Sequence, residues 1–408
     1  MSTTEPAIAV AFKKWLTDHG GEFNPHAYFA SVPSGLSVVG GEDLTADTAV
    51  VKCPFDLAIT EELAQRRLLY LVDLRELISA KQWSERQWIS SYLCFHWILE
   101  DSSHLLHYAY LKTLPCATKL RTPLHFTQSE LQLFQGTNLY GATLDREREW
   151  RKEWSQCHAV FARENADWGR QFTWEAYLTA ATYLSSRAFP SSLLSPTPSL
   201  LSSPDTKPVL LPGIDALNHG RGQPVSWVVS YPNSDDPEPR APSISLILHN
   251  PSTKGQELLN NYGAKPNSEL ILGYGFSLSR NPDDTIVLKI GGINGQKWEV
   301  GRNARGADGL WDELLRSFQQ DTESPPTYED QLDAAAALLE MVQSLLGRLS
   351  SHSDDREVEI RPEVATMLHD YVEGQRDILQ SLINFAHEKE QLAVEAARAE
   401  GIDIVLED

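Results

Sequence analysis

Two groups of short strands, separated by a long helical stretch, dominate the pattern of the sequence. The strand-like runs are bounded by Gly, Pro and polar residues and fall at 36–39, 48–53, 226–231, 243–248 and 285–290. Between the second and third runs, apolar residues recur with helical spacing at 61–80, 83–110 and 144–186. Thr60 precedes the first of these helices and is predicted to cap it. Because the strands do not alternate with single helices, the sequence predicts an α+β fold and excludes a regularly alternating α/β protein.

A change in composition near residue 300 marks a domain boundary. The chain has 408 residues and a net charge of −21, of which residues 301–408, with 24 acidic and nine basic residues, carry −15. Helical spacing of apolar residues resumes there, so we expect an acidic, all-helical domain. The charge has two interpretations: a solvated face that keeps the protein soluble, or a surface that attracts a Lys- and Arg-rich partner.

The composition is that of a folded protein without a membrane segment. With 41% hydrophobic residues the chain is too apolar to be disordered, and no run approaches the ~20 apolar residues of a membrane span. Its acidity argues against nucleic acid as a partner, because Lys and Arg must replace phosphate counterions. The four cysteines lack zinc-site spacing, and no signal peptide opens the sequence. We expect a reduced, intracellular protein, cytoplasmic, nuclear or both.

Common nucleotide-binding and hydrolase motifs do not occur. The sequence has no Gly-x-Gly-x-x-Gly fingerprint, no phosphate-binding loop, no Gly-x-Ser-x-Gly elbow and no His-Glu-x-x-His zinc helix. Most hydrolase and NTPase functions therefore lose their support.

The segment 211–219 places three polar residues among apolar neighbours. Asp215, Asn218 and His219 stand at i, i+3 and i+4, so on a helical turn they would share one face. Two interpretations remain open: a ligand site, or a capped turn in which Asp215 and Asn218 satisfy backbone donors. One His and one Asp make an incomplete metal-ligand set.

The segment 255–276 contains two Tyr-Gly pairs. Tyr262-Gly263 and Tyr274-Gly275 bracket a polar turn and a short apolar helix. Taken alone, the two tyrosines are explained as well by burial with satisfied hydroxyl groups as by a function.

Together the two segments resemble the SET-domain methyltransferases, and among them the class with a split SET domain. This class is typified by the Rubisco large-subunit lysine methyltransferases and their fungal ribosomal-protein relatives. Five motifs match in the family's order: the first SET strands at 35–38 and 52–60, the Ser-Arg helix that ends the insert at 183–189, the Asn-His motif at 218–219, the strand end with its Tyr-Gly pair at 255–263, and the Tyr-Gly-Phe motif at 274–276.

The resemblance implies an α+β chain whose SET-domain β-fold has short strands and a knot-like C-terminal segment. A helical insert would interrupt this fold, and an all-helical C-terminal domain would follow it. The implied divisions are the N-terminal part of the SET domain at 1–60, the insert with a Pro/Ser-rich linker at its end at 61–205, the C-terminal part of the SET domain at 206–299, and an acidic helical domain of the family's substrate-binding type at 300–408.

The resemblance also implies S-adenosyl-L-methionine as methyl donor, and no metal. Carried over by position, the backbone around Ser34, Gly35 and Leu36 would hold the amino-acid part of the donor. Arg187 would pair with the donor's carboxylate, a charge-assisted contact. Asp215 would support the turn that leads to the Asn-His motif.

The remaining site residues follow from the same resemblance. Asn218 and His219 would bind near the adenosine of the donor. Tyr262 matches the family's catalytic tyrosine, which also borders the donor, and Tyr274 and Phe276 would line the channel for the substrate lysine. The chemistry needs a neutral amine positioned at the methyl group and no covalent enzyme intermediate, so the enzyme contributes positioning and exclusion of water.

The implied function is a protein-lysine N-methyltransferase acting on a basic non-histone protein, a ribosomal protein or a translation factor. Two alternatives stay open: a catalytically silent SET scaffold that binds a basic partner, and a protein-histidine methyltransferase. Tyr274 favours lysine, because the related class that methylates histidine in actin tends to lack a tyrosine there. The substrate protein, the number of methyl groups added and the oligomeric state do not follow from the sequence.

Overall fold

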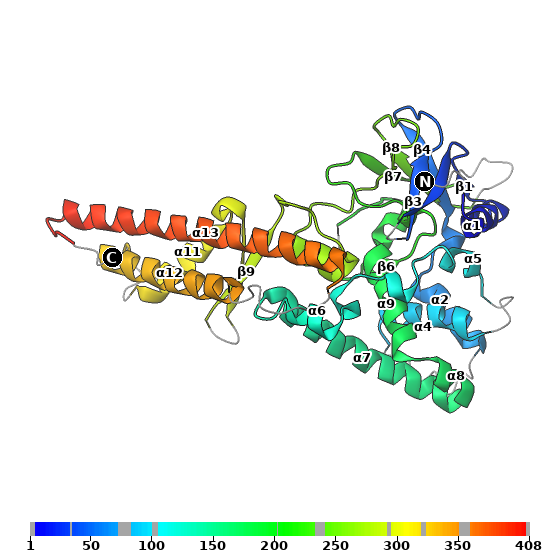
Figure 1. Cartoon of the computed structure of the whole chain (residues 1–408), viewed down its shortest axis with the longest axis horizontal. Helices are drawn as coiled ribbons and strands as arrows, with labels where there is room; N and C mark the ends of the chain where they lie inside the picture. The colour runs from blue at the N-terminus through cyan, green and yellow to red at the C-terminus, as the bar shows by residue number, and fades with distance from the viewer. Residues whose placement is uncertain are drawn as a thin grey trace. The chain divides into compact units, whose positions relative to one another are not determined.

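The structure is a computed structural model that describes residues 5–32, 35–71, 83–99, 105–201, 203–232, 241–291, 295–319, 324–350 and 360–404. The chain forms two compact units, whose elements are labelled in Figure 1. The first unit contains residues 1–120 and 146–264, and the second contains residues 121–145 and 265–408. Each unit thus combines segments that are far apart in the sequence.

The first unit is built on an antiparallel four-stranded sheet. Its strands, in spatial order, are β1 (Glu22–Phe23), β4 (Thr48–Pro54), β8 (Ser243–Leu248) and β7 (Val225–Ser230). Two smaller antiparallel pairs also belong to the described part of this unit, namely β2 (Ala27–Val32) with β3 (Gly35–Gly40), and β5 (Phe189–Pro190) with β6 (Pro208–Val209). The strands predicted at 36–39, 48–53, 226–231 and 243–248 are therefore confirmed within one or two residues.

Helices from the middle of the chain make up the insert of the first unit. They are α2 (Glu61–Leu71), α4 (Glu85–Ile98), α5 (Tyr108–Leu111), the part of α7 (Asn138–Glu164) from Arg146 onward, α8 (Ala166–Gln171) and α9 (Trp174–Arg187); α1 (Ala7–Asp18) precedes the strands. Thr60 caps α2 as predicted, since its Oγ1 accepts a 3.1 Å hydrogen bond from the backbone N–H of Leu63. The predicted continuation of this helix at 72–80 lies outside the described residues.

Two predicted helices are shorter than the periodicity suggested. The helix expected over 83–110 ends at Ile98, where Leu99 is extended, and a separate short helix begins at Tyr108. The helix expected over 144–186 is three helices, because Asn165 and Thr173 accept hydrogen bonds from the following backbone N–H groups and cap α8 and α9. Such side-chain caps compete with continued helix, and apolar spacing does not reveal them.

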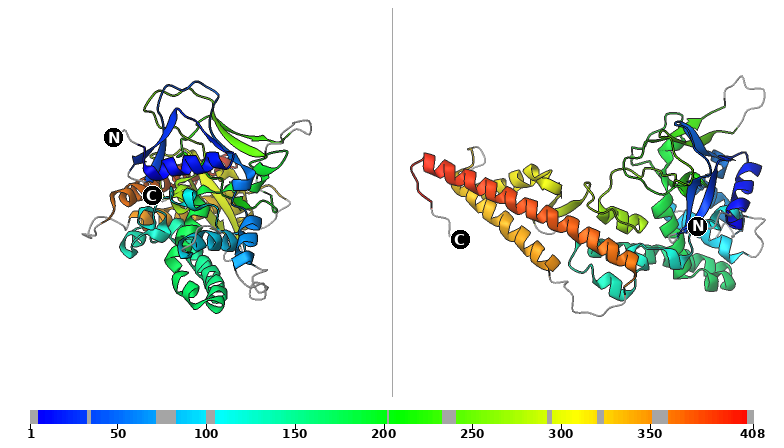
Figure 2. Two further views of the ribbon diagram at one scale, coloured as in Figure 1. Left: turned by 90° about the vertical axis from the view of Figure 1, so that its right-hand side faces the viewer. Right: turned by 45° about the horizontal axis from the view of Figure 1, so that its top comes forward.

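In its described residues the second unit is mostly helical, with one hairpin. It contains α6 (Gln128–Gln132), the first part of α7, α10 (Asn267–Glu269), a π-helix (Leu270–Tyr274), the hairpin of β9 (Thr285–Ile290) and β10 (Gln296–Gly301), α11 (Ala307–Phe318), α12 (Tyr328–Ser350) and α13 (Pro362–Ala399). The long helices α12 and α13 lie side by side, as the views of Figure 2 show. The strand predicted at 285–290 and the helices predicted after residue 300 are confirmed.

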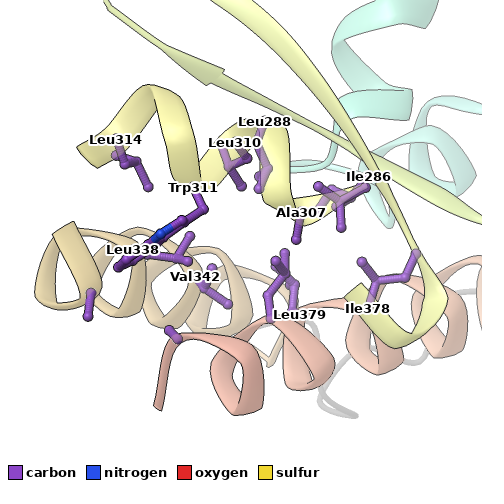
Figure 3. Close-up of a cluster of buried hydrophobic side chains, with 14 of the residues drawn as sticks. Ile286, Leu288, Ala307, Leu310, Trp311, Leu314, Leu338, Val342, Ile378 and Leu379 are labelled. Carbon is purple, nitrogen blue, oxygen red and sulfur yellow. The ribbon is translucent and has the colours of Figure 1, made fainter. Parts of the chain in front are cut away.

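The core of the second unit lies between the hairpin and the three C-terminal helices. Figure 3 shows its side chains, which come from β9, α11, α12 and α13 and converge on one another: Ile286, Leu288, Ala307, Leu310, Trp311, Leu314, Leu338, Val342, Ile378 and Leu379. An ion-pair network adds to this packing, since Arg302 contacts Asp284, Glu373 and Asp377 at 3.2, 2.6 and 3.0 Å.

None of the helices in the described ranges is long and apolar enough to cross a membrane. All four cysteines are free thiols; Cys53, Cys94 and Cys157 are buried and Cys116 is exposed.

Candidate functional site

One segment of the first unit joins the motifs that the sequence analysis singled out. Residues 255–260 lie between β3 on one side and the Asn-His motif on the other. On the first side, the N–H of Leu258 donates to the carbonyl of Val38 at 2.8 Å; on the second, the N–H of Asn260 donates to the carbonyl of Asn218 at 2.7 Å. The chain therefore brings residues from three distant stretches of the sequence into one site.

Tyr262, at the end of this segment, is held at three points. Its backbone N–H donates to Nδ1 of His219 at 3.0 Å, and the two rings stack with centroids 5.1 Å apart. Its phenol O–H donates to the carbonyl oxygen of Leu217 at 2.9 Å. Because Nδ1 of His219 accepts this hydrogen bond, the neutral imidazole ring carries its hydrogen on Nε2. The phenol and the carbonyl thus form a fixed pair of oxygen atoms.

Glu257 connects the Asn-His motif to β3. Its Oε1 accepts hydrogen bonds from Nδ2 of Asn218 at 2.8 Å and from Oγ of the buried Ser37 at 2.5 Å. The sequence analysis did not assign Glu257 to the site. Its position in the Gly-Gln-Glu run was the available signal, but both of its partners are distant in the sequence.

Arg187 and Asp215 are brought together at the end of α9. Nη1 of Arg187 donates to the backbone carbonyl of Asp215 at 3.0 Å and lies 3.4 Å from its Oδ2. The carboxylate, 5% exposed, also accepts from the phenol of Tyr110 at 2.7 Å and from the N–H of Gly213 at 3.1 Å. Tyr110 was not predicted as part of the site, and no local sequence pattern marks it.

Burial governs the protonation of this cluster. Burial raises the pKa of the Asp215 carboxyl, while the charge of Arg187 and the hydrogen bond from Tyr110 act against that rise. Burial also raises the pKa of the Tyr110 phenol well above its ordinary value, so the phenol stays a hydrogen-bond donor. For Arg187 burial would lower the pKa, but the Asp215 carboxylate together with the phenols of Tyr110 and Tyr262 outweighs burial, so the pKa is raised. Arg187 is therefore a permanently charged cation on a fixed anchor.

Asp215, Asn218 and His219 do not stand on one helical turn, so the condition under which they would share a face is not met. Only Ile214–Ala216 forms a short 3-10 helix, after Gly213 with φ 88°, and Leu217 is already extended. The backbone of Asn218 and His219 then pairs with Asn260 as a parallel bridge. Asp215 consequently contacts Arg187, whereas Asn218 contacts Glu257. The long-range pairing overrides the local helical spacing.

The predicted donor-binding residues of the N-terminal strand are only partly described. Ser34 lies outside the described residues. Gly35 and Leu36 begin β3 and are half-buried, and Gly35 has φ 140°, a conformation that favours glycine. The structure thus places Gly35 and Leu36 on the same strand as Ser37, the partner of Glu257.

Tyr274 and Phe276 lie in the second unit, at the end of the π-helix. Gly275 between them has φ 80° and ends that helix. A Cβ atom on Gly275 would lie 2.7 Å from the backbone carbon of Arg121 and 2.8 Å from the backbone nitrogen of Thr122, so only glycine fits. The rings of Tyr274 and Phe276 meet edge to face at 6.2 Å. Burial raises the pKa of the Tyr274 phenol.

Among the described residues, no group of three or more His, Cys, Asp or Glu side chains could hold a metal ion.

Sequence comparison finds relatives among fungal methyltransferases. No protein-family model matches the chain. The chain is 33% identical over 254 residues to the ribosomal lysine N-methyltransferase set10 of Schizosaccharomyces pombe, an alignment that covers 62% of this chain and 41% of that protein. It is 28% identical over 215 residues to ribosomal lysine N-methyltransferase 1 of Saccharomyces cerevisiae, covering 44% and 34% of the two chains. The chain thus matches less than half the length of these two relatives.

Comparison of structures gives a match over almost the whole chain. The SET domain of LSMT bound to lysine and AdoHcy has a TM-score of 0.75 at 18% identity, covering 96% of this chain and 94% of that chain. Rubisco LSMT bound to AdoMet has a TM-score of 0.71 at 18% identity, covering 99% and 98%. The similarity confirms the predicted fold class. Over almost its whole length the chain has the fold of the SET domain of LSMT, and its sequence is similar to those of two ribosomal lysine N-methyltransferases.

Proposed function

We propose that the protein transfers methyl groups from S-adenosylmethionine to lysine side chains of another protein. The observation that carries the proposal is the arrangement of Tyr262, whose phenol is fixed on the Leu217 carbonyl and whose backbone is fixed on His219. The names of the relatives, both ribosomal lysine N-methyltransferases, support it.

The residues of the first unit suit the donor. Arg187 offers a permanent positive charge for the donor's carboxylate; Asp215 occupies only part of its five N–H donors. Asn218 and His219 offer polar groups for the adenosine of the donor. Gly35 and Leu36, at the start of β3, offer backbone N–H and C=O groups for its amino-acid part. Bound S-adenosylmethionine would supply a sulfonium methyl group, whose C–S bond breaks as a bond from carbon to the lysine nitrogen forms.

The chain's own contribution is to position and neutralise the target amine. The Tyr262 phenol oxygen and the Leu217 carbonyl oxygen, 2.9 Å apart, can orient the amine and accept weak C–H···O contacts from a polarised methyl group. An apolar channel lowers the pKa of an entering lysine, because burial disfavours the ammonium form. In our proposal Tyr274 and Phe276 line that channel. The substrate ammonium group loses a proton to solvent, and the resulting amine is itself the nucleophile, so no nucleophilic Ser or Cys is needed.

We further propose that the substrate is a basic non-histone protein, a ribosomal protein or a translation factor. The names of the relatives and the net charge of −15 in residues 301–408 support this choice. In this proposal the division into 1–60, 61–205, 206–299 and 300–408 describes the parts of the sequence, whereas the compact units divide after residues 120, 145 and 264. The last part would be the acidic docking domain, and the protein would act inside the cell. The rate of methyl transfer should fall as the salt concentration rises to ~0.5 M, where charge screening is strong. An unchanged rate would mean that the acidic charge of residues 301–408 serves solubility and does not attract the substrate.

Two measurements test the proposal against a silent scaffold. Calorimetry with S-adenosylmethionine should show binding, whereas a scaffold need not bind the donor. The protein with labelled donor should then label a basic protein in a lysate from cells that lack this enzyme, identified by mass spectrometry of the labelled band. Tyr262→Phe should lose the labelling, and Tyr70→Phe, at a 79% exposed tyrosine, should keep it. No labelling in any lysate protein would contradict the proposal.

A further inference from the structure

Lys265 is a lysine of the second unit that neither the motifs nor the proposed mechanism uses. It follows Tyr262 by three residues, and its ammonium lies 5.8 Å from the ring centroid of Tyr274. The same ammonium forms an ion pair with Glu269, one helical turn further along the chain. Only 22% of the Lys265 side chain is exposed. A lysine held in this way has lost the freedom that surface lysines keep.

The backbone that carries Lys265 is fixed as well. Its carbonyl accepts a 2.8 Å hydrogen bond from Nδ2 of Asn281, a fully buried residue. The backbone carbonyl of Asn281 in turn accepts a 2.9 Å hydrogen bond from Nε of Arg302. Lys265 therefore starts from a rigid point of the second unit and reaches toward Tyr274 from there.

The contact between Lys265 and Tyr274 is polar as well as close. Burial would lower the pKa of Lys265, but its interactions with Glu269, and in addition those with the Tyr274 phenol, outweigh burial and leave the pKa raised. The same contact lowers the pKa of Tyr274, although burial outweighs it and leaves that pKa raised. An ammonium group has donors and no acceptor, so the phenol oxygen must be the acceptor and keeps its own hydrogen for another partner.

We propose that Lys265, anchored by Glu269, is a positioning residue that fixes the orientation of the Tyr274 phenol and thereby the geometry of the lysine channel. The inference rests on the proposed function for the role of Tyr274. Because Glu269 compensates the charge of Lys265, the pair acts by orientation and not by repelling the substrate's ammonium group. Lys265→Met removes the donor and keeps the length of the side chain.

Kinetics of a double-mutant cycle test the proposal. Lys265→Met should lower kcat about 10-fold, in the range expected for a misplaced positioning group, with unchanged calorimetric binding of S-adenosylmethionine. Tyr274→Phe should lower kcat too, and Lys265→Met should add nothing in that background, because both changes remove one interaction. Lys265→Arg, which keeps the donors, should restore most of kcat. Lys297→Met, at an exposed lysine of β10, is the matched control and should be neutral.

A titration reports the same contact without turnover. With ¹³Cζ-labelled tyrosine, the resonance lost in Tyr274→Phe identifies Tyr274, and its pKa should rise in Lys265→Met. An unchanged Tyr274 pKa, or additive losses of kcat in the double variant, would overturn the inference while the proposed function stands. If the wild-type protein transfers no methyl group to any protein, the proposed function fails and this inference fails with it.

Discussion

The backbone N–H of Tyr262 donates to Nδ1 of His219 at 3.0 Å, and the two aromatic rings stack 5.1 Å apart at 27°. One side chain therefore fixes both the backbone and the ring of the proposed catalytic tyrosine. The tyrosine's hydroxyl is fixed separately, by the carbonyl of Leu217. The Asn-His motif thus has a role in this structure that is independent of any contact with the donor.

His219→Ala should disorder Tyr262 while the fold persists. The lost hydrogen bond costs about 1 kcal/mol of unfolding free energy, but the loss of positioning should lower kcat roughly 10²-fold. Urea unfolding and single-turnover methyl transfer measure the two effects. His387→Ala, at an exposed histidine of α13, is the control and should change neither. A His219→Ala protein with wild-type kcat would show that Tyr262 is positioned by other contacts.

Arg187→Met should destabilise the first unit, because it leaves the buried Asp215 carboxylate without its cation. Breaking such a pair costs about 3 kcal/mol. The pKa of Asp215 is already raised by burial and should rise further in the variant. The native variant then binds a proton that the unfolded chain does not. The loss of unfolding free energy relative to wild type should therefore shrink as the pH falls through the pKa of Asp215 in the folded variant.

Urea unfolding at pH 8 and pH 5 measures that deficit. Arg170→Met, which removes a surface ion pair with Asp167, is the control and should stay within about 0.5 kcal/mol of wild type at both pH values. If the loss of unfolding free energy in Arg187→Met grew as the pH falls, Asp215 would not be the buried carboxylate that Arg187 compensates.

Because two histidines of the insert are buried, we expect the unfolding free energy to fall in mild acid. His107 contacts the phenol of Tyr92 at 2.7 Å and the carbonyl of Leu57 at 3.1 Å, and burial lowers its pKa to about 3. Burial lowers the pKa of His96 to about 4. Below pH 6.5 the unfolded chain binds protons that these native histidines do not, so stability should fall from there toward pH 4, by about 1.4 kcal/mol per pH unit for each proton.

His107→Gln isolates one of these protons. The variant loses hydrogen bonds and should be less stable at pH 7.5, but its unfolding free energy should fall less steeply between pH 6.5 and 4.5 than that of wild type. Urea midpoints across this range are the measurement, with His387→Gln as the exposed control. Equal slopes for His107→Gln and wild type would mean that His107 is protonated in the native state.

Gly275→Ala tests how tightly the Tyr274 segment is held. The new Cβ would press on the backbone of Arg121 and Thr122 in addition to the cost of its positive φ. Gly222 has φ 71° and no atom within 4 Å of such a Cβ, so Gly222→Ala is a matched control that measures the cost of the positive φ alone. We expect a loss of about 1 kcal/mol for Gly222→Ala and about 3 kcal/mol for Gly275→Ala, with reduced kcat only in the latter. Equal losses would show that the segment shifts freely.

What the sequence predicted correctly depends on local physics. The strand Thr48–Pro54 and the helix α12 follow from β-branched alternation and from helical apolar spacing, both of which persist in the folded chain. The cap on α2 also follows from local chemistry, because Thr60 and Leu63 are three residues apart. The breaks at Asn165 and Thr173 were missed, since a capping residue inside an apolar pattern looks like an ordinary polar position.

What the sequence missed depends on distant partners. Glu257 binds Asn218 across 39 residues and Ser37 across 220 residues, so no spacing rule could pair them. Tyr110 reaches Asp215 across 105 residues. The turn at Asp215 departs from a helix for the same reason, since pairing of the following residues with Asn260 decides its backbone. The family resemblance singled out Tyr262 and His219, and the structure shows that His219 holds the backbone and the ring of Tyr262.

The most direct test of the account is the chemical identity of the labelled residue. A basic ribosomal-protein fraction is incubated with methyl-labelled S-adenosylmethionine and the protein, then hydrolysed for amino-acid analysis. The account predicts label in methylated lysine, reduced at least roughly 10²-fold by Tyr262→Phe with donor binding retained. Label in methylated histidine, or no label from a protein that binds the donor, would contradict it.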